Sequence, residues 1–301
     1  MQFEAQVVGA FGRHLQVRDA RGERLAARPR GRGLQLVCGD RVRCEWDAQH
    51  AELFVIEALP RQTCLYRSNA QGRTEPVVAN LHSVLVVLAP LPAPDWFVID
   101  RYLCAASSAG LAAAVVVNKC ELGLASLECE LAVYGRAGYP WRACSARTGE
   151  GLEALPALFA AGSGVLVGQS GVGKSALVGR LAPEADALTG ELTRDDEGRH
   201  TTTASRLYEL GGGGELIDSP GVRDFAPALE QLDARDLGFP EVGALAAHCR
   251  FADCSHMQEP GCAVRDAAQA AELSSRRYES YRRLRRLRAD LTAARGPRRR
   301  N

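Results

Sequence analysis

The sequence predicts an α/β protein in three parts: a small β-barrel, a mostly parallel doubly wound sheet and a C-terminal α-helical module. Residues 1–67 consist of short segments of mixed apolar and polar residues between turn formers, which is typical of barrel strands. Strand-like and helix-like segments alternate through residues 77–239, as in a doubly wound sheet. In residues 240–301 the alternation stops, and a cluster of cysteine and histidine precedes an arginine-rich helical segment.

The N-terminal part is expected to be an OB-type barrel, although an SH3-like barrel would produce much the same pattern. Its basic residues include Arg28, Arg30, Arg32, Arg41, Arg43 and Arg61. These arginines indicate either a solvated surface or a contact with RNA, and both interpretations stay open. The polar stretch 68–76 is interpreted as a linker to the second part.

In the second part, strands are predicted at VLVVLAP, AAAVVVNK, GYPWRACSA, GVLVG and ELID. Helices are predicted at residues 95–109, at 151–161 and directly after residue 175. The apolar runs at 84–89 and 111–117 are much shorter than the roughly 20 residues of a membrane-spanning helix.

The composition is that of a soluble globular protein, with 46% hydrophobic residues, 24% charged residues and a net charge of +1. The N-terminal sequence MQFEAQVVGAFG lacks the long apolar core of a secretory signal. Most cysteines are scattered singly, as in a reducing compartment, and one cluster lies near the C-terminus. We therefore expect a cytoplasmic, monomeric protein that does not associate with membranes.

A phosphate-binding loop is predicted where an apolar strand meets a helix. Contacts to the nucleotide are expected along Gly168, Gln169, Ser170, Gly171, Val172, Gly173, Lys174, Ser175 and Ala176. The glycines let backbone N–H groups converge on phosphates at the positive end of the helix. Lys174 would reach the β- and γ-phosphates, and the Ser175 hydroxyl would bind Mg²⁺.

A second phosphate-side motif, Asp218-Ser-Pro-Gly221, ends a later apolar segment. Alone, this motif is merely a turn, because Asp, Pro and Gly are turn formers. Beside a phosphate-binding loop it becomes a nucleotide switch, in which Asp218 holds Mg²⁺ and the Gly221 N–H senses the γ-phosphate.

Guanine as the base is indicated by Asn118-Lys119-Cys-Glu121, which resembles the Asn-Lys-x-Asp signature of GTPases. Glu121 is one methylene longer than the usual aspartate but can still accept the two guanine N–H groups. Taken alone, the motif would be a strand ending in a helix cap. Ser145-Ala146 resembles the second base-contacting loop of GTPases and supports the guanine interpretation.

The order of these motifs is circularly permuted. Most GTPases place the phosphate-binding loop before the base-binding motifs, whereas here residues 118–146 precede residues 168–175. The site can survive such a permutation because the sheet itself is unchanged. As a consequence, the Asp218–Gly221 switch leads directly toward the C-terminal module.

A structural zinc site is predicted in that module. Cys249, Cys254, His256 and Cys262 supply the four N/S ligands of a closed tetrahedral site, with His248 as a competing ligand. The following helical segment carries Tyr281, Leu284 and Leu287 at helical spacing among arginines. A solvated amphipathic helix is the default interpretation, and the RGPRRRN ending favours RNA binding.

Taken together, the sequence resembles the bacterial ribosome-small-subunit-dependent GTPase A family along nearly its whole length. The matches are Ala79-Asn80, Asp100-Arg-Tyr-Leu103, GQSGVGKS, Gly198-Arg-His-Thr-Thr-Thr203, IDSPGVRDF and the Cys/His spacing. The departures are Glu121, where the family has aspartate, and His82, where the family generally has aspartate. The resemblance implies an OB barrel, a permuted GTPase domain and a zinc module.

The resemblance also implies roles for residues outside the motifs derived above. Thr202 would be the switch I threonine that closes on Mg²⁺ and the γ-phosphate. Val222 stands where other GTPases carry a water-orienting glutamine, so His200 is the candidate for that task. The alternative is that His200 is a flexible loop residue or contacts ribosomal RNA.

The implied function is GTP hydrolysis coupled to late maturation of the small ribosomal subunit, with GTP/GDP, Mg²⁺ and one structural Zn²⁺ as cofactors. The implied partners are that subunit and its rRNA. Two alternatives are a permuted GTPase of large-subunit assembly and a nucleotide-gated RNA-binding module.

Overall fold

The computed structural model describes residues 2–12, 14–31, 33–69, 73–185, 205–219, 221 and 226–294. Its strands are β1 (Gln2–Phe11), β2 (His14–Asp19), β3 (Arg24–Pro29), β4 (Arg41–Asp47), β5 (Glu52–Ala58), β6 (Cys64–Ser68), β7 (Thr74–Ala79), β8 (Ser83–Leu88), β9 (Ala112–Val117), β10 (Trp141–Ala143), β11 (Ser163–Gly168), β12 (Ser205–Glu209) and β13 (Glu215–Asp218). The α-helices are α1 (Trp96–Ser108), α2 (Glu128–Arg136), α3 (Lys174–Leu181), α6 (Pro240–Ala246), α7 (Ala263–Gln269) and α8 (Ser275–Ala294). Short 3₁₀ helices are η1 (Cys120–Leu122), η2 (Leu152–Ala154), η3 (Pro156–Phe159) and η4 (Leu229–Gln231).

The N-terminal barrel is closed. Strands follow the order β1-β2-β3-β5-β4, and β1 also pairs with β4. Alternate residues point inward and form one apolar core of Ala5, Val7, Leu15, Val17, Ala27, Val42, Cys44, Leu53 and Val55. This confirms the predicted OB-type barrel.

The barrel arginines singled out from the sequence are, where described, paired with acids. The ion pairs are Arg28–Glu52, Arg30–Glu45, Arg41–Glu4, Arg43–Glu57 and Arg61–Asp40, at 2.6–3.2 Å. Arg32 lies outside the described residues. The paired arginines do not form an uncompensated positive face, so this part of the barrel favours the solvated-surface interpretation.

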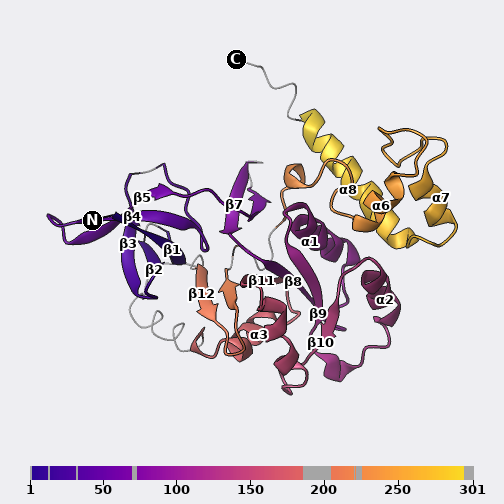
Figure 1. Cartoon of the computed structure of the whole chain (residues 1–301). Coiled ribbons are helices and arrows are strands. Elements are labelled where there is room, and N and C mark those ends of the chain that lie inside the picture. The colour runs from indigo at the N-terminus through magenta and orange to yellow at the C-terminus, as the bar shows by residue number, and fades with distance from the viewer. Residues whose placement is uncertain are drawn as a thin grey trace, which may run out of the picture.

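The second part is a largely parallel sheet, as predicted. Its order is β10-β9-β8-β11-β13-β12, in which all neighbours are parallel except the antiparallel pair β12–β13. Strand β12, which the sequence analysis did not predict, also pairs with β1 of the barrel (Figure 1). At this junction Arg18 of β2 forms ion pairs with Glu209 (3.0 Å) and with Glu215. The barrel and the sheet are therefore joined by main-chain hydrogen bonds as well as by charge.

Helices cover both faces of this sheet. In β8, Val84, Val86 and Leu88 face the core beneath α1 and α2, whereas Leu85 and Val87 face the core beneath α3. Burial on both faces explains why this strand is an uninterrupted apolar run. Helix α1 begins at an N-cap, Asp95, close to the predicted start.

Two sequence predictions in this region were wrong. The segment 151–161 forms two 3₁₀ helices instead of one α-helix, and Pro156, which has no N–H to donate, begins the second. The supposed linker belongs instead to a hairpin of β6 and β7, in which Ser68 pairs with Thr74 and Tyr66 pairs with Pro76. The polar residues Ser68 and Thr74 lie next to the turn of the hairpin, while Val77 and Val78, farther along β7, are buried.

The C-terminal module packs on the outer side of α1 (Figure 1). Its core includes Phe239, Tyr281 and Leu284, and Cys104 of α1 belongs to the same cluster. Tyr281 and Leu284 are buried as their helical spacing predicts, but Leu287 remains 37% exposed. The arginine-rich helix α8 is thus a packed element of the module and not a separate solvated tail.

Candidate nucleotide and metal sites

The phosphate-binding loop is built between β11 and α3, as predicted. Gly168 has φ +146°, and an added Cβ would lie 2.1 Å from the Val87 carbonyl oxygen of the neighbouring strand. Gly173 has φ +93°, and an added Cβ would lie 2.3 Å from Asn118 Nδ2. Both positions therefore require glycine, for backbone conformation and for space.

Lys174 is held over this loop. Its Nζ donates hydrogen bonds of 2.7 Å to the carbonyl oxygens of Gly168 and Gln169. Ser170, Gly171, Ser175 and Ala176 are exposed along the same loop and at the start of α3. An exposed loop at a helix N-terminus with an ammonium group beside it is an arrangement that binds phosphates.

Asn118 joins the phosphate side to the base side. Its Nδ2 donates to the Val172 carbonyl oxygen (2.8 Å), and its Oδ1 accepts from the Ala146 N–H (3.0 Å). Lys119 Nζ donates to the carbonyl oxygens of Leu91 (2.8 Å) and Gly171 (2.7 Å). Motifs that appear in permuted order along the chain are therefore brought together at one end of the sheet.

Glu121 has one carboxylate oxygen available for a ligand. Oε1 accepts from Arg147 Nε (3.0 Å), whereas Oε2 is buried and has no hydrogen-bond partner of good geometry among the described residues. The Ser145 hydroxyl and the Arg147 guanidinium hold the pKa of Glu121 below its usual range. An ionised carboxylate with an unsatisfied oxygen fits the N–H edge of guanine.

The second phosphate-side motif lies beside the first. Strand β13 runs parallel to β11, so Asp218 ends its strand near the phosphate-binding loop. A Cβ added to Gly221 would lie 3.4 Å from Val77 Cγ1 and 3.6 Å from Arg67 Nη1. The switch glycine therefore lies beside the β6–β7 hairpin. The middle part of this hairpin, residues 68–76, is the segment that the sequence analysis interpreted as a linker.

The hairpin also holds the chain that follows the switch. Ala228 N–H donates to the Tyr66 carbonyl oxygen (3.0 Å), and Pro227 forms an antiparallel bridge with Arg67. The apolar pairs Cys64-Leu65 and Val77-Val78 were the signals that could have identified these strands. The remaining predicted site residues, His200 and Thr202, and also Val222, lie outside the described residues.

The predicted zinc ligands are brought together. The ligand atoms of Cys249, Cys254, His256 and Cys262 all lie within 4.8 Å of one another. His256 Nδ1 lies 3.5 Å from Cys249 Sγ and 3.6 Å from Cys262 Sγ, while His248 is exposed and is not part of this cluster. Burial and Arg285 lower the pKa of His256, which favours the neutral imidazole that a metal ligand must be. Three thiols and one imidazole at this spacing fit a tetrahedral zinc ion.

Comparisons with known proteins agree with this geometry. A family model described as RsgA GTPase matches residues 58–227. The chain belongs to the RsgA GTPase family. As a member of that family it is a GTP hydrolase.

The similarity to individual RsgA proteins extends over most of the chain. The Small ribosomal subunit biogenesis GTPase RsgA of Azotobacter vinelandii is 42% identical over 253 residues, which cover 82% of this chain and 73% of the relative. The protein of the same name from Haemophilus influenzae is 39% identical over 294 residues, which cover 93% and 84%.

Solved structures show the same fold. YjeQ from Thermotoga maritima superposes with a TM-score of 0.71 at 26% identity, covering 99% of this chain and 100% of that one. YloQ, described as a circularly permuted GTPase, gives a TM-score of 0.70 at 22% identity and supports the fold alone, covering 99% and 97%. In this RsgA-family chain, the base-side strands β9 and β10 likewise precede β11. None of the helices in the described ranges is long and apolar enough to cross a membrane.

Proposed function

We propose that this RsgA-family GTPase binds the small ribosomal subunit through its rRNA and couples GTP hydrolysis to late subunit maturation and to its own release. The observation that supports the proposal is the double hydrogen bonding of Asn118, which connects Val172 of the predicted phosphate-binding loop to Ala146 of the predicted base-binding loop. The names of the RsgA relatives supply the small subunit as the object of that activity. The protein would act as a cytoplasmic monomer.

Within this site each residue has a proposed task. Glu121, Ser145 and Ala146, with Asn118 and Lys119, would recognise guanine, and residues 168–176 would bind the phosphates. Ser175, Thr202 and Asp218 would hold Mg²⁺, which when bound neutralises charge on the β- and γ-phosphates. His200 would orient the attacking water, because Val222 has no hydrogen-bonding group.

The proposed domains are 1–67, 77–239 and 240–301. The hairpin of β6 and β7 spans the boundary between the first two domains. It lies beside Gly221, and its Arg67 forms a β-bridge with Pro227. A change at the switch would therefore reach the barrel through the hairpin and the zinc module through the chain after residue 228. We propose that this route releases the subunit once GTP has been hydrolysed.

Turnover assays with purified ribosomal particles test the proposal. Small subunits should raise GTP hydrolysis strongly, whereas large subunits and free rRNA should not. Small subunits should also bind more tightly with a non-hydrolysable GTP analogue than with GDP, because a ligand shifts an equilibrium only through differential affinity. Stimulation by large subunits would indicate the other assembly pathway, and equal stimulation by free rRNA would indicate an RNA-binding module.

A further inference from the structure

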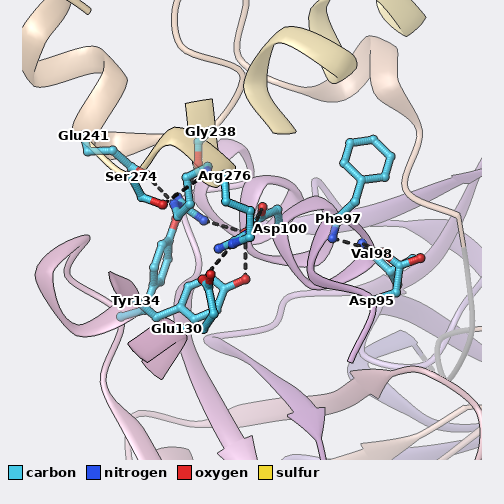
Figure 2. A network of polar contacts seen from close by, with 12 residues as sticks. Asp95, Phe97, Val98, Asp100, Glu130, Tyr134, Gly238, Glu241, Ser274 and Arg276 are labelled. Carbon is cyan, nitrogen blue, oxygen red and sulfur yellow. Dashed lines mark hydrogen bonds and ion pairs between the residues drawn. The ribbon is translucent and has the colours of Figure 1, made fainter. Parts of the chain in front are cut away.

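Arginines gather where α8 crosses α1, and two of them form ion pairs with acids. The Nη2 atom of each is nevertheless buried without a hydrogen-bond partner among the described residues. Arg276 donates to Asp100 (2.6 Å) and Glu130 (2.7 Å), as Figure 2 shows, and Arg277 forms ion pairs with Asp100 (2.8 Å) and Glu241. Every acid of this network is thereby assigned to Arg276 or Arg277.

Two further arginines at the same crossing have no acidic partner. Neither Arg101 of α1 nor Arg283 of α8 makes a hydrogen bond or an ion pair with any residue in the described part of the chain. The Arg101 Nε atom is buried and has no hydrogen-bond partner there. The Arg283 guanidinium lies 3.9 Å from the centroid of the Phe97 ring. Phe97 precedes Arg101 by one helical turn, so the ring and both guanidinium groups gather on one side of α1.

The surroundings of this pair are electropositive. Burial lowers the pKa of Arg101, and the charge of Arg283 lowers it further, against the opposing effects of Tyr102 and Asp95. Asp95 is a nearby acid, and one of its carboxylate oxygens, Oδ1, caps the N-terminus of α1. It accepts the N–H groups of Phe97 (3.0 Å) and Val98 (3.2 Å), as Figure 2 shows. Neither arginine forms an ion pair with Asp95 or with any other acid in the described part of the chain, so Asp95 offsets their repulsion only through its charge at a distance.

We propose that Arg101 and Arg283, together with the Phe97 ring, form a binding site for a phosphodiester group of the small-subunit rRNA. This inference rests on the function proposed above and adds a specific contact to it. A guanidinium group stacked on an aromatic ring keeps its edge N–H groups free for a phosphate. A phosphate at this place would accept from the guanidinium edges of the two arginines, and its charge would offset the repulsion between them.

The stability of variants without these arginines separates a purely structural role from an anion-binding role. If the two arginines held α1 against α8, removing them would destabilise the module. If they form an anion site, replacing a partly buried, unpaired charge by an apolar side chain should leave stability unchanged or raise it. The variants Arg101→Met and Arg283→Met keep much of the apolar stem and separate these roles.

The first experiment measures small-subunit binding by each variant across a series of salt concentrations. Each substitution should reduce the slope of log affinity against log salt by about 1, and the double variant by about 2. Arg286→Met is the matched control, because this exposed arginine of α8 already has an acidic partner, Glu279 (3.2 Å), which it shares with Arg282. Its slope should stay close to that of the wild type. A wild-type slope in the double variant would overturn the proposal.

The second experiment uses inorganic phosphate alone. Phosphate should raise the melting temperature of the wild type more than chloride at equal ionic strength, and this difference should be smaller in the double variant, which keeps only the predicted phosphate-binding loop at residues 168–176. A phosphate effect of equal size in both proteins would overturn the site, and so would a lower melting temperature of Arg101→Met without phosphate. If the wild type fails to bind small subunits at all, the proposed function fails, and the phosphate experiment still reports on the anion site.

Discussion

Arg277 Nη1 lies 2.8 Å from Asp100 Oδ1, and the two side chains are only 1% and 0% exposed. Asp100 belongs to α1 of the GTPase sheet, and Arg277 belongs to α8 of the zinc module. Tyr134 OH donates to the same Asp100 oxygen (2.8 Å), and Arg276 occupies the other one. One buried carboxylate therefore connects α1, α2 and α8.

Asp100→Asn should lower the free energy of unfolding by up to roughly 3–5 kcal/mol, because it removes the charge of the buried carboxylate that Arg276 and Arg277 share, while Glu130 and Glu241 still pair with one arginine each. Denaturant unfolding followed by circular dichroism measures this loss. The matched control is Glu279→Gln, which removes an exposed partner of Arg282 (3.0 Å) and should cost at most about 1 kcal/mol. Equal losses in the two variants would mean that burial does not set the strength of this network.

Lys174→Ala and Ser175→Ala should each abolish measurable GTP turnover, with losses of at least about 10²-fold, because their groups would stabilise the phosphates and Mg²⁺. Single-turnover hydrolysis measures the effect, and unchanged circular dichroism shows that the fold persists. Wild-type protein that hydrolyses ATP as readily as GTP would overturn the guanine assignment.

Glu121→Gln should weaken GDP binding at least about tenfold, because a charge-assisted hydrogen bond contributes roughly 1.5–3 kcal/mol. Glu121→Asp should tighten binding or leave it unchanged. Ser145 and Arg147 lower the pKa of Glu121, so the charged form persists as the pH falls. The ratio of wild-type to Glu121→Gln affinity for GDP should therefore stay constant from pH 7 to about pH 5, above the ordinary glutamate pKa of about 4.3. This ratio cancels the titration of the GDP phosphate, which has a pKa of about 6, and a change in the ratio near pH 6 would contradict the prediction.

One zinc ion per chain is expected by elemental analysis, and Cys254→Ser should release it and unfold the C-terminal module. Structural zinc contributes roughly 10–16 kcal/mol to small modules, so the loss should be local and complete. Cys129→Ser, at an exposed thiol outside the cluster, is the control and should retain the metal. Full zinc retention by Cys254→Ser would show that the ligand set is wrong.

His200→Ala should suppress small-subunit-stimulated turnover far more than GTP binding, because the proposed task of His200 concerns only the attacking water. Stimulated turnover and nucleotide affinity, measured on the same preparation, separate the two effects. A stimulated rate equal to that of the wild type would remove His200 from the mechanism.

Local sequence determined the parts of the site that depend on backbone conformation and on ligand chemistry. Gly168 and Gly173 mark a loop that other residues cannot adopt, and three cysteines with one histidine within a short span can meet around one metal. The apolar run of β8 likewise predicts burial on both faces of a sheet. These features need only neighbouring residues, so the sequence carries them directly.

The tertiary structure alone decided which distant elements meet. Asp100 and Arg277 are 177 residues apart in the chain, and no local pattern predicts their pairing. The sequence did not predict strand β12, although this strand joins the barrel to the sheet. Part of the hairpin of β6 and β7 was mistaken for a linker because the residues next to its turn are polar. The net charge of a surface also depends on the tertiary structure. Arg43 forms an ion pair with Glu57 and Arg283 forms none within the described residues, yet the two arginines look alike in the sequence. A local pattern specifies backbone conformation and burial, whereas the partner of a charge or of an edge strand depends on packing between segments far apart in the chain.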